Sequence, residues 1–336
     1  MIFVVGNSRS GTTMTGRILN RHSSVFTFNE LHFFEQIWQE SNANKTYEID
    51  AAIKLLTLLF SLQRDGYFFH FENPAYQPES QKIIDSLGYP GKKCTSAEIF
   101  KAFLKYEAAL HLKTRTCEQT PRNVYYIDNI RSLYPEAKFI HIIRDPRDVM
   151  ISQKNRWKRR KFNANKNNVT LFNTVRQWVN YHPITIMKLW QGANKVIERN
   201  KNNPNFLSVR YEDILISPEA ECKKICQFLE INFESNMLQV PQIGSSLGKD
   251  TPSKLGLDAS KVYGWKKGGL NKAEIYITEK MGKDIMQNQN YKSSEQKFSP
   301  LLFWYYFTFP IKLSVAILLS LKRLKNLQDV INRRLK

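Results

Sequence analysis

Hydrophobic residues at the start of the chain form a short unbroken run that ends in a glycine-rich segment. Ile2 to Val5 are large or β-branched, as is typical of a buried parallel strand. Gly6 to Thr13 contain two glycines, and residues 14–20 can continue as a helix. Glycine lets a backbone come close to an anion, and the first amides of a helix offer unpaired N–H groups. The pattern predicts a strand, a loop that binds phosphate or a similar oxyanion, and a helix.

The rest of the pattern predicts an α/β fold. Apolar runs over residues 137–143 and 206–210 predict two further buried strands, and residues 22–30 predict a shorter strand beside the first. Helical spacing of apolar residues recurs over residues 31–38, 50–64, 96–113, 124–135 and 217–230. We therefore expect a P-loop-type three-layer fold, with a central parallel sheet flanked by helices and a hydrophobic and basic helical tail at the C-terminus.

One long stretch of the chain has little helical or strand pattern. Residues 65–95 contain three prolines, Pro74, Pro78 and Pro90. Proline and the polar residues around it favour loops. The stretch is expected to be rich in loops and to form part of a lid or of the wall beside an acceptor.

The oxyanion loop lacks the lysine of ATP and GTP hydrolases. Thr12 stands where that lysine reaches the outer phosphates, and the nearest cation is Arg9. A group that carries less charge than a phosphoryl group during transfer needs less neutralisation by Mg²⁺. One arginine and a row of hydroxyls then suffice, unless the segment is only a tight connection between a strand and a helix.

A second anion site is predicted where the strand at 137–143 ends. Arg144 follows that strand directly, Pro146 breaks it, and Asp148 is expected to cap the next helix. Ser152 lies in the first turns of that helix. Arg144 and Ser152 can clamp a second phosphate, the arginine by a forked pair of hydrogen bonds. The alternative is a structural Arg–Asp pair.

A single carboxylate ends the predicted strand at 22–30. Glu30 would lie at the carboxyl edge of the sheet, where α/β enzymes carry their chemistry. It is a candidate general base. The equal alternative is that Glu30 supplies a negative charge to the first turn of the following helix.

Charge is concentrated in two parts of the chain. The protein has 336 residues, 42% hydrophobic, and a net charge of +20, and residues 154–166 and 311–336 each carry seven basic residues. Local patches indicate specific anionic partners, and no nucleic-acid-binding motif accompanies them, so no nucleic acid is expected. The first run follows the predicted phosphate helix and can border the site for an anionic glycan, a lipid headgroup or an acidic peptide. A solvated helix face is the alternative.

Cysteine usage and the start of the chain point to a reducing compartment. The four cysteines form no CxxC pair, so buried free thiols are expected and a metal site is not. The first strand begins at residue 2, which leaves no room for a signal peptide. We expect the catalytic part to be cytoplasmic. The cysteines are Cys94, Cys117, Cys222 and Cys226.

The C-terminal part is the most apolar. Pro300 and Pro310 are expected to interrupt residues 298–321, and Lys312 would cost about 2.5–3.5 kcal/mol near a bilayer centre. Residues 322–336 place leucines and an isoleucine on one face among cations, which suits an interfacial helix on anionic lipid. The prediction is a catalytic domain over 1–292 and a tail over 298–336 that lies on the inner membrane surface, rather than a helical hairpin packed on the domain.

Three separated blocks together resemble the sulfotransferases that use 3′-phosphoadenosine 5′-phosphosulfate (PAPS). GNSRSGTTM, residues 6–14, resembles the loop for the 5′-phosphosulfate. FIHIIRDPRDVMISQ, residues 139–153, resembles the block for the 3′-phosphate, and LSVRYEDILISPE, residues 207–219, the block that closes the nucleotide site. The resemblance spans residues 1–292. It is nearest to the branch of tyrosylprotein sulfotransferases and bacterial enzymes, with an arginine in the loop and a glutamate after the first helix.

The resemblance implies a role for each matching residue. PAPS would be the sulfuryl donor, a hydroxyl or an amine the acceptor, and no metal would be needed. Glu30 would be the general base, helped by Arg9, and Tyr211 would lie near the adenosine. Residues 260–269 resemble the loop that caps the nucleotide, through which Lys266 or Lys267 would reach it. The 5′-phosphosulfate would be held by Arg9, Ser10, Gly11, Thr12 and Thr13, and the 3′-phosphate by Arg144 and Ser152.

Three departures from the family pattern leave questions open. The catalytic histidine of the small-molecule branch, in a Lys-Thr-His context, is absent, and Met14 replaces a tryptophan that stacks on adenine. Gln119 stands where many relatives have a lysine before Thr-Pro, so the cation at the bridging oxygen would be Arg9 or another residue. The alternatives are a P-loop kinase or other NTPase, and an inactive nucleotide-binding protein at the membrane surface.

Overall fold

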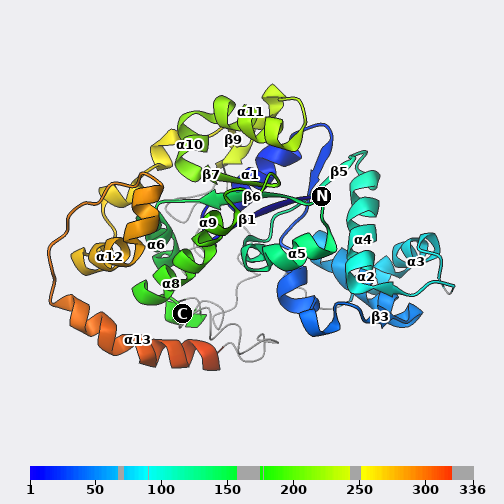
Figure 1. Ribbon diagram of the computed structural model, residues 1–336, viewed down its shortest axis with the longest axis horizontal. Coiled ribbons are helices and arrows are strands. Elements are labelled where there is room, and N and C mark those ends of the chain that lie inside the picture. Colours follow the sequence, from blue (N-terminus) through cyan, green and yellow to red (C-terminus); the bar gives the residue numbers. More distant parts are fainter. Residues whose placement is uncertain (67–71, 90, 157–174, 177, 243–250, 320–336) are drawn as a thin grey trace.

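The centre of the fold is a parallel sheet of five strands. The structure, a computed structural model, describes residues 1–66, 72–89, 91–156, 175–176, 178–242 and 251–319 (Figure 1). The strand order is β2-β5-β1-β6-β7, and every neighbouring pair is parallel. The strands are β1 (Ile2–Gly6), β2 (Val25–Thr27), β5 (Arg115–Glu118), β6 (Lys138–Ile143) and β7 (Phe206–Arg210).

Both faces of the sheet are covered. Ile2 and Val4 of β1 pack with helices α1 (Thr12–Asn20) and α11 (Pro218–Leu229) on one face. Phe3 and Val5 point the other way, into a cluster built with α2 (Ile49–Arg64), α4 (Ser96–Leu110) and α5 (Ile127–Leu133). This alternation explains why β1 is hydrophobic at every position. Figure 1 shows α1, α10 and α11 on one side of the sheet and α5, α8 and α9 on the other.

A third cluster lies beyond the end of β6. It joins Ile143 to helices α6 (Pro146–Lys154), α8 (Pro183–Asn194), α12 (Lys272–Asn288) and α13 (Leu301–Leu318). The remaining elements are small; they are β3 (Thr46–Tyr47), β4 (Cys94–Thr95), β8 (Pro241–Gln242), β9 (Thr251–Leu255), α3 (Gln77–Ser86), α9 (Val196–Asn200), α10 (Tyr211–Ile216) and the short helical turns η1 (Phe33–Ile37), η2 (Glu40–Asn42), η3 (Pro74–Tyr76), η4 (Pro121–Tyr126), η7 (Ser235–Leu238), η8 (Ala259–Lys261) and η9 (Gly264–Lys267).

The predicted three-layer fold is confirmed, with two corrections in the sheet. The apolar runs at 2–5, 137–143 and 206–210 form β1, β6 and β7. The strand predicted over 22–30 is only β2, and it does not lie beside β1, because β5 separates them. The pattern does not reveal β5, since half of its four residues are charged. Its residues Thr116 and Cys117 are nevertheless buried.

The helices agree with the pattern in most places. The spacing at 50–64, 96–113 and 217–230 corresponds to α2, α4 and α11. Residues 31–38, expected to be a helix, form only the π-helical turn η1. The expectation of loops over 65–95 is wrong for the described part, which contains α3.

Proline position explains the error over 65–95. Pro74 and Pro78 occupy the first turns of η3 and α3, where a missing N–H costs no hydrogen bond. Pro90 lies outside the described residues. A similar correction applies to α6, whose cap is Asp145 and not Asp148: the Asp145 side chain accepts a 2.9 Å hydrogen bond from the Arg147 backbone N–H.

The tail forms a longer helix than expected. α13 has 18 residues and continues through Pro310, so the predicted interruption there is wrong. Among the described residues it is the one helix that by length and composition could cross a membrane, and 17% of its residues are buried. Leu302, Leu313 and Ala316 are its buried residues. Residues 320–336, with the predicted interfacial helix, lie outside the described residues.

A candidate active site at the carboxyl edge of the sheet

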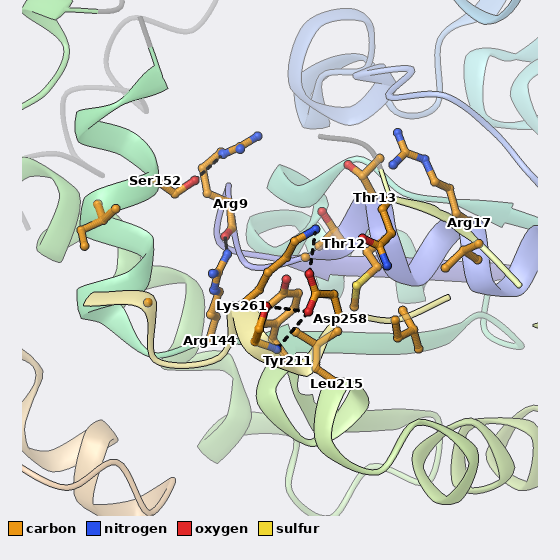
Figure 2. A pocket seen from close by; sticks show the side chains of 18 of the residues that line it. Arg9, Thr12, Thr13, Arg17, Arg144, Ser152, Tyr211, Leu215, Asp258 and Lys261 are labelled. Atoms are coloured by element: carbon orange, nitrogen blue, oxygen red, sulfur yellow. Dashed lines mark hydrogen bonds and ion pairs between the residues drawn. The ribbon is translucent and has the colours of Figure 1, made fainter. Parts of the chain in front are cut away.

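A cavity of about 1070 Å³ opens where β1, β6 and β7 end (Figure 2). Nine of the eleven residues predicted to serve as ligands or as the base line it. The cavity thus gathers residues from the three separated blocks and from the segment after β2. The nine are Arg9, Gly11, Thr12, Thr13, Glu30, Arg144, Ser152, Tyr211 and Lys267.

Two glycines fit the oxyanion loop tightly against its neighbours. A Cβ at Gly6 would lie 2.5 Å from the carbonyl oxygen of Ile142, so the loop leaves β1 in close contact with β6. Gly11 has a φ of +104°, and a Cβ there would lie 2.3 Å from the Tyr211 ring. Gly11 immediately precedes α1 and offers no side chain as a cap. The first amides of α1 therefore face the cavity without a capping side chain, which is the arrangement that binds anions.

Two arginines connect the loop to the second anion site. The Arg9 Nε donates to the Ser152 Oγ at 2.9 Å, a link between the loop and α6 that Figure 2 shows. The Arg144 Nη1 donates to the Arg9 carbonyl oxygen at 3.3 Å. The Arg144 guanidinium also stacks on the Tyr211 ring at 4.3 Å. Arg9 of the oxyanion loop is thus held by Ser152 of α6, and Arg144, which precedes α6, is held by the backbone of the loop.

Positive charge dominates the cavity wall. Among the residues that the structure describes, seven basic and two acidic ones line it. Such a wall attracts a ligand with several negative charges. Together with the glycine cradle, this fits a ligand with more than one anionic group. The basic residues are Arg9, Arg17, Arg144, Arg156, Lys254, Lys261 and Lys267, and the acidic ones are Glu30 and Asp258.

The predicted capping segment, residues 260–269, is fastened to α6. The Asp148 Oδ1 accepts a 2.8 Å hydrogen bond from the Trp265 N–H, and the Arg147 guanidinium lies 3.9 Å over the Trp265 ring. Burial raises the pKa of Asp148, although the nearby Arg144 opposes the shift. Lys267 lines the cavity and donates to the Ser260 carbonyl oxygen at 3.1 Å.

Two predicted ligands do not line the cavity. The Lys266 ammonium lies over the rings of Tyr263 and Trp265, at 5.1 and 5.9 Å. Ser10 is a fully buried residue of the loop, and its hydroxyl has no hydrogen-bond partner among the described residues. A direct role for either in holding a ligand therefore stays a prediction.

Glu30 reaches the cavity from the segment that follows β2. Its side chain is 41% exposed, and its Oε2 lies 3.4 Å from the His32 Nε2. Gln119, at the position of the family lysine, is 7% exposed, and among the described residues its Oε1 has no hydrogen-bond partner. Gln119 is packed behind α1, where a Cβ on Gly16 would lie 2.9 Å from it, and it supplies no charge to the cavity.

Several cations of the site were not predicted. Arg17 follows Thr13 by one helical turn, so the i, i+4 spacing could have placed both on the same face of α1. Lys254 comes from β9, a part of the chain with no clear pattern. Lys261 lies in the segment that resembles the capping loop, but the resemblance pointed to Lys266 and Lys267 instead. Of the basic run 154–166, Arg156 lines the cavity, but Lys154 pairs with Glu274 of α12 at 2.7 Å. Residues 157–166 lie outside the described residues.

The thiols and carboxylates offer little for a metal. All four cysteines are free and buried, as predicted. Within the described ranges, no group of three or more His, Cys, Asp or Glu side chains is placed to hold a metal ion. That the reaction needs no metal stays a prediction.

An oxyanion loop without lysine, a second anion site and a carboxylate in one cationic cavity define an α/β enzyme that transfers an anionic group from a nucleotide. A model of the sulfotransferase family matches residues 2–235. The chain therefore belongs to the sulfotransferase family, whose enzymes transfer a sulfuryl group.

Relatives and solved structures agree with this family. A putative protein-tyrosine sulfotransferase of Caenorhabditis briggsae is 26% identical over 71% of this chain and 68% of its own length. Another, of Caenorhabditis elegans, is 32% identical over 41% of this chain, which spans about half (49%) of that relative. The sulfotransferase domain from the curacin biosynthetic pathway has a TM-score of 0.52 and 19% identity over 87% of this chain and 98% of the domain. That of the Synechococcus PCC 7002 olefin synthase has a TM-score of 0.51 and 17% identity over 85% and 94%.

Proposed function

We propose that this chain transfers a sulfuryl group from PAPS to the hydroxyl or amine of an acceptor, with residues 1–292 as the catalytic domain. The observation that carries the proposal is one cationic cavity that holds Arg9 and the start of α1 together with the carboxylate of Glu30. A nucleotide donor and an acceptor need to meet at such a place.

The donor would occupy the side of the cavity formed by β1, β6 and α6. Arg9, Thr12, Thr13 and the amides around Gly11 would hold the 5′-phosphosulfate. The 3′-phosphate would be held by Arg144 and Ser152, with Tyr211 and Lys267 beside the nucleoside. The donor supplies the sulfuryl group, and the residues of this chain supply alignment, which can account for much of the rate.

Proton transfer would fall to Glu30. As the acceptor oxygen forms its bond to sulfur, the bond from sulfur to the 5′-phosphate oxygen breaks, and the acceptor proton moves to Glu30. Arg9 and the first amides of α1 would stabilise the negative charge on the departing phosphate oxygen. A well-placed base is worth about 10²–10⁴-fold in rate.

An anionic acceptor suits the site. Arg17 and Arg156 line the cavity in addition to the residues assigned to the donor. An acidic peptide, an anionic glycan or an anionic lipid would be attracted to that wall. Similarity to protein-tyrosine sulfotransferases supports a hydroxyl on a peptide among these three.

A thermal-shift titration tests the donor assignment. We expect adenosine 3′,5′-bisphosphate to stabilise the protein, since a ligand at 100 times its dissociation constant contributes about 2.7 kcal/mol. ATP with Mg²⁺ should have little effect, because Thr12 replaces the lysine that ATP hydrolases use. Stabilisation by ATP alone would favour a kinase, and a response to neither nucleotide would favour an inactive protein.

We also propose that α13 holds the enzyme at an anionic membrane surface on the cytoplasmic side. Phe303, Trp304 and Phe307 of α13 are 69, 60 and 68% exposed. Trp304 and the exposed Tyr306 combine an apolar ring with a polar group, as is typical of residues at a membrane interface, and Phe303 and Phe307 add apolar surface. The basic residues of 322–336 follow in the sequence.

Co-sedimentation with vesicles tests the membrane assignment. The full chain should sediment with vesicles that contain phosphatidylserine and much less with pure phosphatidylcholine. Replacing Trp304 and Phe307 with serine should reduce binding, whereas replacing Leu110, an exposed leucine at the end of α4, should not. Equal binding by all three proteins would contradict an attachment through α13.

A further inference from the structure

The backbone next to Glu30 is fixed by the segment that follows β5. The Leu31 N–H donates to the Glu118 Oε1 at 3.3 Å, and the His32 N–H donates to the Thr120 Oγ1 at 3.2 Å. Glu118 is fully enclosed and also accepts hydrogen bonds from Thr120 and from the Asn123 side chain. Glu118 and Thr120, in the segment where many relatives carry a lysine before Thr-Pro, therefore hold the backbone that follows Glu30 in this chain.

The side chain of His32 lies between two carboxylates. Its Nε2 is 3.4 Å from the Glu30 Oε2, and its Nδ1 is 3.0 Å from the Glu35 Oε2. Glu35 in turn accepts a hydrogen bond from Arg122. The four side chains form a line of alternating charge that ends at the cavity: Arg122, Glu35, His32 and Glu30.

The backbone of His32 is unusual for a residue with a side chain. Its φ is +51°, in the left-handed region, and its side chain is 14% exposed. A non-glycine residue in that region costs free energy and persists where its surroundings hold it. Here the Thr120 hydroxyl and the two carboxylates hold it.

The charges around His32 favour the imidazolium. Burial lowers the pKa of His32, but the hydrogen bonds to Glu30 and Glu35 outweigh burial and raise the pKa to about 9. Burial raises the pKa of Glu35, but Arg122 and His32 outweigh it and lower the pKa to about 2. Burial raises the pKa of Glu118, and the nearby His32 is one of the groups that oppose that rise. At neutral pH both ring nitrogens then carry protons, so His32 donates to both carboxylates and cannot itself accept a proton.

We propose that His32 is the positioning residue for Glu30: anchored by Glu35 and Arg122, it holds the partly exposed carboxylate of Glu30 in the orientation that receives the acceptor proton. The proposal rests on Glu30 as the base of the proposed function. Even beside His32 the Glu30 side chain is 41% exposed. Without the contact to His32 it would spend time in orientations that face away from the acceptor.

Two substitutions of His32 test the contacts of its two ring nitrogens separately. The amide of His32→Gln can reproduce the contact of Nε2 with Glu30, without the charge. The amide of His32→Asn can reproduce the contact of Nδ1 with Glu35, and asparagine tolerates a left-handed φ, but it cannot reach Glu30. We expect His32→Asn to lower kcat by on the order of 10–100-fold, within the range that a 1 Å misplacement produces, and His32→Gln to lower it less. Affinity for adenosine 3′,5′-bisphosphate should stay unchanged in both.

The pH profile distinguishes positioning from a merely structural role. The wild-type kcat should fall above about pH 9 as His32 loses its proton. This alkaline limb should be absent in His32→Asn and shifted to higher pH in His32→Arg, which keeps a cation. His111→Gln, at an exposed position whose ring stacks on Phe26 of β2 and does not line the cavity, is the control and should retain the limb.

A double variant tests whether His32 acts through Glu30. In a Glu30→Gln background, His32→Asn should cost no further activity, because the group that it positions is gone. The same fold loss in both backgrounds would overturn the proposal and leave His32 with a structural role. If Glu30→Gln alone were fully active, the base assignment of the proposed function would fail instead, so the two failures are distinguishable.

Discussion

At the scale of single residues, substitutions in the proposed anion sites should lower nucleotide affinity, whereas substitution of the proposed base should lower kcat. Arg144→Ala removes a guanidinium that stacks on Tyr211 and faces the cavity. We expect it to weaken binding of adenosine 3′,5′-bisphosphate by about 10-fold or more, since a hydrogen bond to a charged group contributes about 1.5–3 kcal/mol.

Glu30→Gln should keep that affinity and lower kcat by about 10²–10⁴-fold. Isothermal titration and initial rates measure the two effects; unchanged nucleotide affinity in Arg144→Ala would sink its assignment.

Gly11 offers a second test at this scale, with a matched control in the same chain. Gly11 and Gly256 have the same φ, +104°, but a Cβ would clash with Tyr211 at Gly11 and meet nothing within 4 Å at Gly256. Gly256→Ala should cost about 1–2 kcal/mol of stability from the left-handed backbone alone. Gly11→Ala should cost more, because the Tyr211 ring has to move. Urea denaturation compares them, and equal losses would mean that the loop yields easily.

The site residues that the sequence predicts are those in contiguous blocks. Arg9, Thr12 and Thr13 follow one strand, and Arg144 follows another, so their meeting at one edge of the sheet follows from the parallel pattern. His32 has no such signal: Glu35 follows it by only three residues, but Arg122, which pairs with Glu35, comes close only in three dimensions. For Lys266 the motif gave no direction for the side chain, which lies over the rings of Tyr263 and Trp265, so its role as a ligand stays a prediction.

At the scale of elements, α6 and α12 are joined by a buried ion pair. The Arg147 guanidinium is 2% exposed and contacts Asp145 at 2.8 Å and Glu279 at 2.7 Å. Arg147→Gln should destabilise the protein by about 3–5 kcal/mol, because two buried carboxylates lose their partner. Lys223→Gln breaks an exposed pair with Glu219 and should cost about 0–1 kcal/mol. Chemical denaturation compares the two; losses of equal size would contradict the account.

The elements that the sequence predicts correctly are those whose hydrophobic pattern has one dominant physical cause. Unbroken hydrophobic runs mark β1 and β6, because parallel strands in the middle of a sheet are buried on both faces. β7 lies at the edge of the sheet and is mostly half-buried, and its sequence includes a serine and an arginine. β5 is as central as β1 and β6, but its ends are charged, and Glu118 is used inside the protein instead of at its surface. The helices α3 and α13 were missed or shortened because proline was read as a break, although one proline lies in a first turn and the other inside a helix.

At the scale of the whole molecule, stability should fall as the solution becomes alkaline. The folded-state pKa values of Glu118 and His32 are both raised: burial raises that of Glu118 to about 7, and contacts with Glu30 and Glu35 overcome burial to raise that of His32 to about 9. A group with a raised pKa stabilises the fold fully below its unfolded pKa and loses that contribution as the pH rises through the folded value. Glu118 has lost most of its contribution by pH 7, whereas His32 loses its contribution up to about pH 9, so the loss from His32 should make the free energy of unfolding decrease between pH 7 and 9.

Urea titrations at several pH values measure this slope. His32→Asn should lower stability at pH 7 and flatten the curve between pH 7 and 9, where His32 loses its proton. Curves that run parallel for the two proteins would show that other groups set the alkaline slope.

The order of the strands has one further consequence. The proposed donor side of the cavity is built by β1, β6 and α6, whereas Glu30 and its supports come from the segments that follow β2 and β5, at the other half of the sheet. Both halves contribute to one cavity. In descent, substitutions in the β2–β5 half can change which acceptor is used while the machinery for the donor is inherited intact, so one ancestral nucleotide site can serve enzymes with unrelated acceptors.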